Sequence, residues 1–230
     1  MNKPYTKLSV LTIAIALFTT GVKAQQGVNI SSDGYGFGVI GKVNNEIKGT
    51  PNLYDDWVEG TAVLADGTVY KDMDLIYDVM DNMLIFKSDK GTPLAFAKPV
   101  KEFTLNFSFN GNVHSRTFRN GFTAIDGATS TTFYEVLSDG NVKLLKKIQK
   151  KVAEERTGGS ILASKVINNL NTYYLSRNQE LVKIKKDKKS ILAALNDKAD
   201  LIESYTDKNK LNFREEDGLV RIVNYYNRAK

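Results

Sequence analysis

The chain has 230 residues, of which 42% are hydrophobic and 25% are charged, and its formal net charge at pH 7 is +6. It contains no cysteine and a single histidine, which excludes disulfides, thiol catalysis, cysteine-ligated metals and the acylated cysteine of a lipoprotein. The length suffices for one sizeable hydrophobic core or for two smaller ones.

The N-terminus has the pattern of a secretory signal peptide. Lys3 and Lys7 precede an apolar run from Leu8 to Phe18, and Val22-Lys23-Ala24 forms an acceptable cleavage site. The run is shorter than the roughly 20 residues of a membrane-spanning helix, which is the alternative interpretation. We therefore expect cleavage after residue 24 and an exported chain, periplasmic or extracellular, that is not a lipoprotein and has no transmembrane span.

Residues 25–48 are expected to form a peripheral glycine-rich arm, mobile or added as an edge strand. Gly36, Gly38 and Gly41 match G-x-G-x-x-G, but a dinucleotide site needs a strand before this motif and a helix after it, and neither is indicated. The same stretch resembles a phosphate-binding loop, except that Val43 replaces the Ser or Thr that would hold Mg²⁺. No cofactor and no metal are expected.

From Trp57 onward the sequence favours strands separated by tight turns. Asp66-Gly67, Asn110-Gly111 and Ser138-Asp139-Gly140 each stand between β-rich runs, as in antiparallel hairpins. Residues 100–109 alternate with a period of two, which is typical of a half-buried strand. One face of that strand would carry the apolar residues Phe103, Leu105, Phe107 and Phe109.

Residues 142–156 fit two structures, and the sequence leaves the choice open. Val142, Leu144, Ile148 and Val152 occupy even positions, as on one face of a strand whose other face carries lysines. Leu144, Leu145, Ile148 and Val152 also fit one side of a helix. The preceding Asp139-Gly140 turn favours the strand.

The last forty residues change to the period of amphipathic helices. Asn196 or Asp197 is expected to cap a second helix, and Asn212 with Glu215 suits a capping box for a third. Gly218 weakens that third helix slightly. We therefore predict an α+β fold in which an antiparallel sheet over residues 49–186, a sandwich or an open barrel-like sheet, carries short C-terminal helices over 187–230.

Several stretches resemble a group of exported proteins of Bacteroidetes-type bacteria that has no established function. The resemblance covers about residues 49–228 and is carried by "GTPNLYDDWVEGTAVLADGTVYKDMDLIYD", "TFYEVLSDGNVKLLKK" and "LVRIVNYYN". It implies export and a β part followed by helices. It implies no activity, ligand or site residue.

Charge is distributed unevenly along the chain. Residues 25–140 carry a net charge of −6, residues 141–189 carry +9, and the remainder is neutral. Such a basic segment attracts anionic partners, and the simpler alternative is a solvated sheet face. We expect a non-catalytic, envelope-associated binding or structural protein whose partner is an anionic envelope component or another protein, and not nucleic acid. The candidate binding residues are Lys143, Lys146, Lys147, Lys150, Lys151, Lys183, Lys185, Lys186, Lys188 and Lys189.

Two other functions have weaker support in the sequence. A hydrolase could use the carboxylates of Asp72, Asp74 and Asp78, which would share one face of a strand. A carrier of apolar ligands could line a cavity with the phenylalanines of residues 103–109, although core packing explains these residues more simply. His114 lies in a strand beside a turn, where an exposed histidine is the common case.

Overall fold

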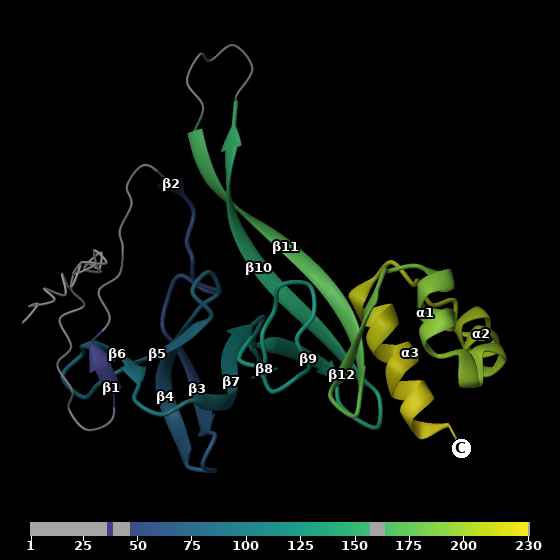
Figure 1. Cartoon of the computed structure of the whole chain (residues 1–230), viewed down its shortest axis with the longest axis horizontal. Coiled ribbons are helices and arrows are strands. Elements are labelled where there is room, and N and C mark those ends of the chain that lie inside the picture. Colours follow the sequence, from purple (N-terminus) through teal and green to yellow (C-terminus); the bar gives the residue numbers. More distant parts are fainter. Residues whose placement is uncertain (1–35, 39–46, 157–163, 230) are drawn as a thin grey trace, which may run out of the picture.

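The computed structural model describes residues 36–38, 47–156 and 164–229. These residues form twelve strands, three α-helices and one short 3-10 helix, η1 (Figure 1). The strands are β1 (Gly36–Gly38), β2 (Ile47–Lys48), β3 (Val58–Leu64), β4 (Val69–Asp78), β5 (Met83–Lys87), β6 (Pro93–Phe96), β7 (Val100–Phe109), β8 (Asn112–Arg119), β9 (Tyr134–Ser138), β10 (Lys143–Glu155), β11 (Ser164–Arg177) and β12 (Glu180–Ile184). The helices are α1 (Lys188–Ala194), η1 (Asn196–Lys198), α2 (Ala199–Lys208) and α3 (Glu216–Arg228).

All twelve strands belong to one open sheet. Its order is β1-β6-β5-β4-β3-β7-β8-β9-β10-β11-β12, and β2 pairs with β11 outside this path. Every pairing is antiparallel except that of β2 with β11. The three helices follow β12 and gather at its end of the sheet (Figure 1). The predicted α+β class, with an antiparallel sheet followed by short helices, is therefore confirmed.

The tight turns join the strands as the sequence predicts. Asn110 and Gly111 both have positive φ, 50° and 76°, which is the geometry of a two-residue hairpin turn and joins β7 to β8. Asn178 and Gln179 also have positive φ, 52° and 69°, and join β11 to β12 without any glycine. Asn and Gly tolerate the left-handed region, whereas Gln179 adopts it although its residue type does not favour it.

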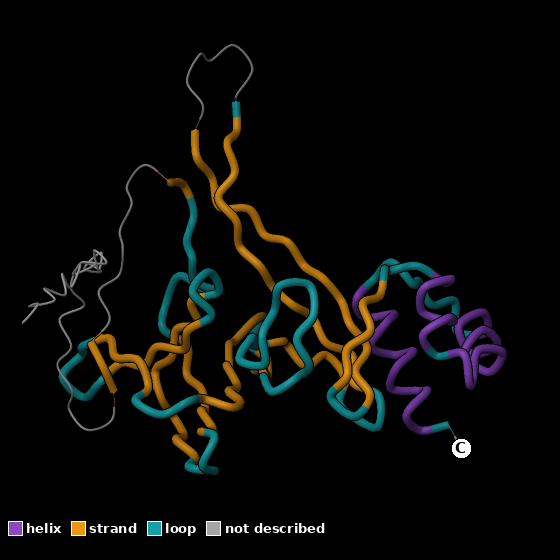
Figure 2. The backbone as a smooth tube through the Cα atoms, in the orientation of Figure 1, coloured by secondary structure: helices purple, strands orange, loops and turns teal. Residues whose placement is uncertain are grey.

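The segment that the sequence left open is a strand. Residues 143–155 form β10, which pairs with β11 from Lys143–Ser176 to Glu155–Ser164. The distal part of this two-stranded hairpin projects away from the rest of the sheet (Figure 2). There the alternation continues with little burial, and Val152 and Leu170 remain 42% and 49% exposed.

Two hydrophobic cores lie on the same face of the sheet. One contains Phe103 and Phe118, stacked at 4.8 Å, with the ring of Tyr77 5.0 Å from that of Phe103. The other lies between the helices and strands β10 to β12 and includes Tyr173 and Ile184. Cross-strand register joins the two, because one continuous row runs through Phe103, Phe118, Glu135, Lys146, Tyr173 and Ile184. We call this side the helix face.

A third, smaller core lies on the opposite face. Tyr134, Leu145 and Tyr174 pack there against Phe122 and Ala128 of the segment between β8 and β9. The phenylalanine alternation in β7 was only partly predictive of burial. Phe103 is fully buried, as expected, but Phe109 is 61% exposed, because β7 extends beyond the layer that covers its first half.

The helix boundaries correct two predicted caps. Asn196 and Asp197 lie within η1, and α2 begins after Lys198 without a side-chain cap. Glu215 is the residue before α3, whereas Asn212 holds the preceding turn by accepting from the backbone N–H of Arg214 and donating to Glu215. The predicted cap residues of α2 and α3 therefore lie near the helix starts, but Asn196, Asp197 and Asn212 do not occupy the N-cap position.

The glycine-rich arm is described in two short pieces. Residues 36–38 form β1, which pairs with β6 at one end of the sheet, and residues 47–48 form β2 beside β11. The first piece contains two glycines of the G-x-G-x-x-G pattern, and it is an edge strand. Among the described residues, no helix is long and apolar enough to cross a membrane.

Candidate functional site

The lysines of β10 are mostly engaged in contacts within the protein. Lys143 donates to Asp139 (2.5 Å) and to the carbonyl of Gly140 (3.0 Å). Lys150 donates to the carbonyls of Thr50 (2.9 Å) and Asn52 (2.5 Å). Lys146 and Lys147 are both buried, and only Lys151 is exposed. Alternation also divides these lysines, because Lys146 and Lys150 lie on the helix face and the other three on the opposite face.

The second lysine-rich stretch remains more open. Lys183 pairs with Asp126 at 2.9 Å, and Lys188 pairs with Glu203 at 2.6 Å. Three exposed lysines between and beside these two have no carboxylate partner in the part of the chain that the structure describes. They lie at the junction of β12 and α1, and we call them the β12–α1 lysine cluster: Lys185, Lys186 and Lys189.

Local structure fixes the backbone of this cluster. Asp187 precedes α1, and its carboxylate accepts from the backbone N–H of Ser190 at 2.7 Å. The hydroxyl of Ser190 in turn accepts from the backbone N–H of Lys185 at 2.9 Å. The ammonium of Lys186 lies 5.3 Å from the centre of the Tyr173 ring, within the range of a cation–π contact. The Asp187 carboxylate therefore serves as the N-cap of α1, and the cluster lysines lie on both sides of it along the chain.

A charged network between the two cores was not predicted. Glu135 is 5% exposed and receives two hydrogen bonds from Arg116, of 2.7 and 2.8 Å, and one ion pair from Lys146 at 2.8 Å. Lys146 also binds both carboxylate oxygens of Glu216, at 3.0 and 2.9 Å, and the hydroxyl of Tyr173 donates to Glu216 at 2.8 Å. This network attaches the first turn of α3 to the sheet.

The pKa values within the network follow from its contacts. Burial alone would raise the pKa of Glu135, but Arg116 and Lys146 outweigh it and hold that pKa below its usual value. Burial raises the pKa of the Tyr173 hydroxyl, and the hydrogen bond to Glu216 raises it further. Glu135 is therefore a carboxylate, and Tyr173 a neutral phenol, at physiological pH. The arrangement therefore holds opposite charges together between the sheet and α3.

The acidic residues that suggested a hydrolase do not form one cluster. Asp72 lies in a bulge of β4 with a φ of 54°, opposite the register shift between Gly60 and Ala62. That bulge interrupts the period-two alternation from which Asp72, Asp74 and Asp78 were predicted to share one face of the strand. Asp74 is 53% exposed and approaches Lys87 at 3.7 Å, whereas Asp78 accepts from the backbone N–H of Asp81. The hydrolase stays a prediction that gains no support from these contacts.

His114 and the phenylalanines also have definite positions. His114 is exposed and stacks on Phe107, with ring centres 5.6 Å apart. Phe103 packs in the aromatic core and not against an open cavity. Within the described ranges, no group of three or more His, Asp or Glu side chains could hold a metal ion.

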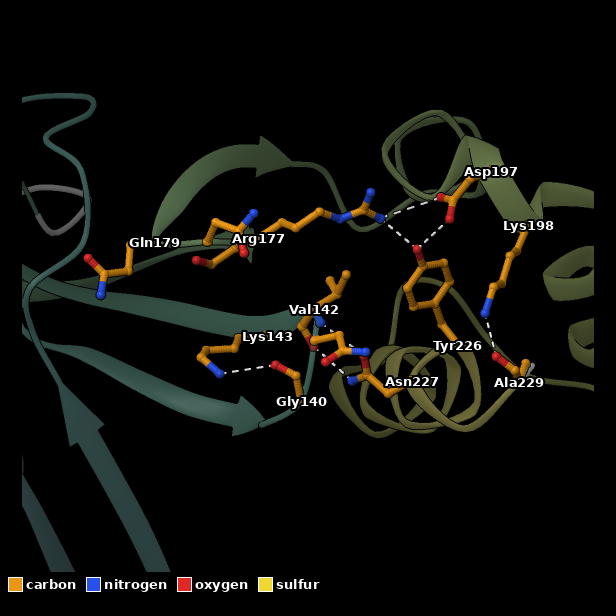
Figure 3. Close-up of a pocket in the computed structure, with 13 residues that line it drawn as sticks. Gly140, Val142, Lys143, Arg177, Gln179, Asp197, Lys198, Tyr226, Asn227 and Ala229 are labelled. Carbon is orange, nitrogen blue, oxygen red and sulfur yellow. Dashed lines mark hydrogen bonds and ion pairs between the residues drawn. The ribbon is translucent and has the colours of Figure 1, made fainter.

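A polar pocket of about 590 Å³ opens beside the helices, at the turn ends of β10 and β11 (Figure 3). Arg177 at the end of β11 reaches the hydroxyl of Tyr226 (2.5 Å) and Asp197 (3.5 Å), and Tyr226 donates to Asp197 at 2.6 Å. Lys198 lies 5.0 Å from the centre of the Tyr226 ring. Its ammonium donates to the carbonyl of Ala229.

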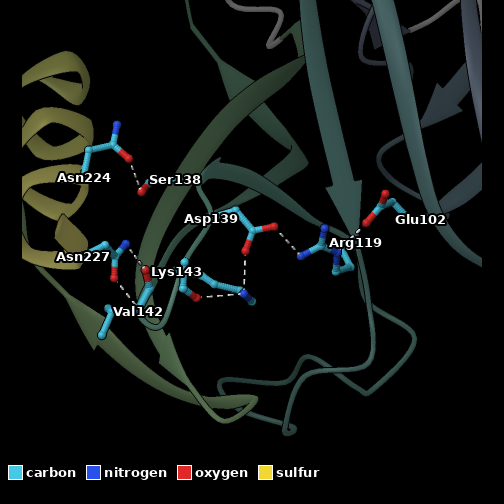
Figure 4. A network of polar contacts seen from close by, with 9 residues as sticks. Glu102, Arg119, Ser138, Asp139, Val142, Lys143, Asn224 and Asn227 are labelled. Atoms are coloured by element: carbon cyan, nitrogen blue, oxygen red, sulfur yellow. Dashed lines mark hydrogen bonds and ion pairs between the residues drawn. The ribbon is translucent and has the colours of Figure 1, made fainter.

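A set of polar contacts joins the β9–β10 turn, which borders this pocket, to α3 (Figure 4). The amide of Asn227 pairs with the backbone of Val142 through two hydrogen bonds, of 2.9 and 2.7 Å. Asn224 accepts from Ser138 at 2.8 Å. Asp139 in the β9–β10 turn is held by Lys143 and by Arg119 at 3.0 Å. These contacts connect the β9–β10 side of the pocket to α3.

Sequence reasoning missed this pocket because its residues are scattered. They come from the β9–β10 turn, the β11–β12 turn, η1 and the end of α3. Comparisons with protein-family models, with curated proteins and with solved structures find no match to the chain. The functional argument therefore depends on the residues and contacts described above.

Proposed function

We propose that the protein is an exported, non-catalytic binding protein of the cell envelope. It holds an anionic envelope surface through the β12–α1 lysine cluster, Lys185, Lys186 and Lys189. Export is supported by the signal-peptide pattern of residues 1–24 and by the resemblance to exported proteins of Bacteroidetes-type bacteria.

The observation that carries the proposal is the placement of these three lysines. They lie within five residues of one another, they are exposed, and they have no carboxylate partner among the residues that the structure describes. Most of the other predicted lysines donate to acids or carbonyls of the protein itself. Lys151 of β10 is also exposed without an ion pair among the described residues, but the cluster is where three such lysines lie together.

Phosphate-bearing lipid headgroups are the partner that fits this cluster. Each lysine near a negatively charged membrane surface contributes about 1 kcal/mol of binding, and the attraction is screened within about 8 Å at physiological salt. Three lysines together then strengthen binding about 100-fold at low salt. Since this attraction is electrostatic, salt should weaken it steeply.

Co-sedimentation with lipid vesicles tests the proposal. The mature chain, residues 25–230, should pellet with vesicles that contain anionic phospholipid at low salt, and should stay in solution with zwitterionic vesicles. High salt should release it. The combined variant Lys185→Gln, Lys186→Gln, Lys189→Gln should bind anionic vesicles about 100-fold more weakly.

A matched variant controls for net charge. Lys71, Lys90 and Lys101 are also exposed and have no ion pair among the described residues, but they lie in the N-terminal half of the sheet. Changing these three to Gln removes the same charge and should change binding only slightly. Equal loss in both triple variants would contradict the assignment, as would equal binding to anionic and zwitterionic vesicles.

A further inference from the structure

The polar pocket beside α3 has the chemistry of a separate ligand site. Its volume of about 590 Å³ lies within the range of pockets that take small organic molecules, about 300–1,000 Å³. Its walls come from four segments that are tied to one another, so the pocket is formed in the structure without a ligand (Figure 3). None of the β12–α1 lysines lines it.

Arg177 has a guanidinium group whose hydrogen-bond donors are only partly used within the protein. One of its terminal nitrogens contacts Tyr226 and Asp197, whereas its Nε and its other terminal nitrogen have no partner among the described residues. The side chain is 53% exposed. A guanidinium donates from a fixed planar fork that matches the two oxygens of a carboxylate. Arg177 can therefore donate to the carboxylate of a ligand while it keeps its hydrogen bond to Tyr226.

Lys198 carries the positive charge that the pocket does not compensate. It contacts a carbonyl and the face of the Tyr226 ring, and no carboxylate pairs with it among the described residues. Lys143, in contrast, is paired with Asp139, and Arg177 has Asp197 beside it. The charged lining residues sum to +2, and Asp139, which pairs with Lys143 from outside the lining, leaves one excess positive charge. A ligand with a single negative charge complements it, whereas a dianionic phosphate would exceed it and be repelled more strongly by Asp197.

Neutral polar groups complete the lining. The side-chain amides of Asn141, Asn178 and Gln179 are exposed and have no partner within the described part of the chain, and all three residues border the pocket. The hydroxyl of Ser176, another lining residue, is buried and has no partner there either. Amides both donate and accept, which is what ligand hydroxyl groups require.

We propose that this pocket binds a small acidic saccharide that carries one carboxylate. The carboxylate lies against Arg177 and Lys198, and the sugar hydroxyls lie against the amides of Asn141, Asn178 and Gln179. The site is distinct from the β12–α1 lysine cluster. Its occupation therefore neither requires nor excludes the vesicle binding described above.

Nuclear magnetic resonance titration of the ¹⁵N-labelled mature chain with glucuronate tests the site. We expect saturable shifts in the backbone signals of Arg177, Asn178 and Gln179. Glucose, which lacks the carboxylate, should produce none at the same concentrations. Arg177→Gln and Lys198→Gln should each weaken glucuronate binding about 10-fold or more, because each removes a charged donor.

Two control variants make the outcome decisive. Arg221→Gln removes an exposed cation of α3 that does not line the pocket, and it should leave the affinity unchanged. The triple β12–α1 lysine variant should also bind glucuronate normally, which separates this site from the membrane proposal. The absence of saturable shifts with glucuronate, equal shifts with glucose or with inorganic phosphate, or equal losses in Arg177→Gln and Arg221→Gln would each overturn the assignment.

Discussion

The carboxylate of Glu135 lies between two cations, Arg116 and Lys146. Glu135 and Lys146 are the two charged members of the cross-strand row that joins the two cores. Replacing Glu135 with Gln leaves the buried Lys146 and the half-buried Arg116 with a weaker acceptor. Breaking one member of a buried ion pair destabilises a protein by about 3–5 kcal/mol, so Glu135→Gln should lower the free energy of unfolding by that amount. Urea unfolding followed by circular dichroism measures this change.

The matched control is Glu203→Gln, which removes a glutamate that pairs with Lys188 where both side chains are 45% exposed. Its effect should stay below about 1 kcal/mol. Since the pKa of Glu135 is lowered, its contribution is fully present above the pKa of an unfolded glutamate, about 4.3. The contribution is lost as pH falls through the lower folded-state pKa. The stability difference between wild type and Glu135→Gln should therefore shrink on acidification, and a difference that grows instead would refute this account.

Gly218 shows how a local rule can be reversed by packing. A glycine in a helix is normally about 1 kcal/mol less favourable than alanine. A Cβ at position 218 would, however, lie 2.1 Å from the carbonyl oxygen of Asn212, whose backbone crosses the first turn of α3. Gly218→Ala should therefore destabilise the protein by about 1–3 kcal/mol.

Thermal unfolding measures the effect of Gly218→Ala. Ser204→Ala, at an exposed position of α2, is the reference, and should be neutral or slightly stabilising because only helix propensity changes. A Gly218→Ala variant as stable as wild type would show that the turn at Asn212 can move away from α3.

Single residues also mark the limit of what the sequence could predict. The lysine-rich pattern of β10 suggested an external binding surface, but Lys146 is buried because its partners Glu135 and Glu216 neutralise it. Glu216 is 70 positions from Lys146 along the chain, and Arg116 is 19 positions from Glu135. Such pairs depend on cross-strand register and helix placement, which one sequence does not specify.

At the scale of elements, local chemistry predicted more. The Asp-Gly and Asn-Gly turns place the β3–β4, β7–β8 and β9–β10 hairpins, and the period-two alternation predicts β7. Residues 142–156 remained ambiguous because both periods fit; pairing with β9 and β11 decides for the strand. The helices were expected from their apolar period, and only their caps were misplaced.

The N-terminal arm is an element whose removal the fold should tolerate. β1 adds three residues to an outer strand and β2 adds two beside β11. A chain that begins at Gly49 should unfold cooperatively, within about 2 kcal/mol of the mature protein. The few hydrogen bonds lost are worth about 1 kcal/mol each, and removing the arm also removes the entropic cost of ordering it. Urea denaturation compares the two chains.

Deleting residues 187–230 provides the contrast to the arm deletion. It removes the helices that cover Leu144, Tyr173, Leu175 and Ile184, so this chain should lose cooperative unfolding. If the arm deletion were as damaging as the helix deletion, the arm would belong to the core and the predicted domain boundary at residue 49 would be wrong.

At the scale of the whole molecule, the two ends of the sheet carry opposite net charge. The segment with a net charge of −6 forms the strands from β1 to β9, and the segment with +9 forms β10 to β12 and the start of α1 (Figure 1). Near an anionic surface, this asymmetry favours an approach with β12 and the helices toward that surface. The β12–α1 lysine cluster lies at that end.

Fractionation of cells that express the full chain tests the proposal of an exported binding protein most directly. We predict a mature protein beginning at Gln25 that is retained with the envelope at low salt and released at high salt. The Lys185→Gln, Lys186→Gln, Lys189→Gln variant should be exported normally but recovered in the soluble fraction. An uncleaved chain in the cytoplasm, or envelope retention that neither salt nor the triple variant alters, would contradict the account.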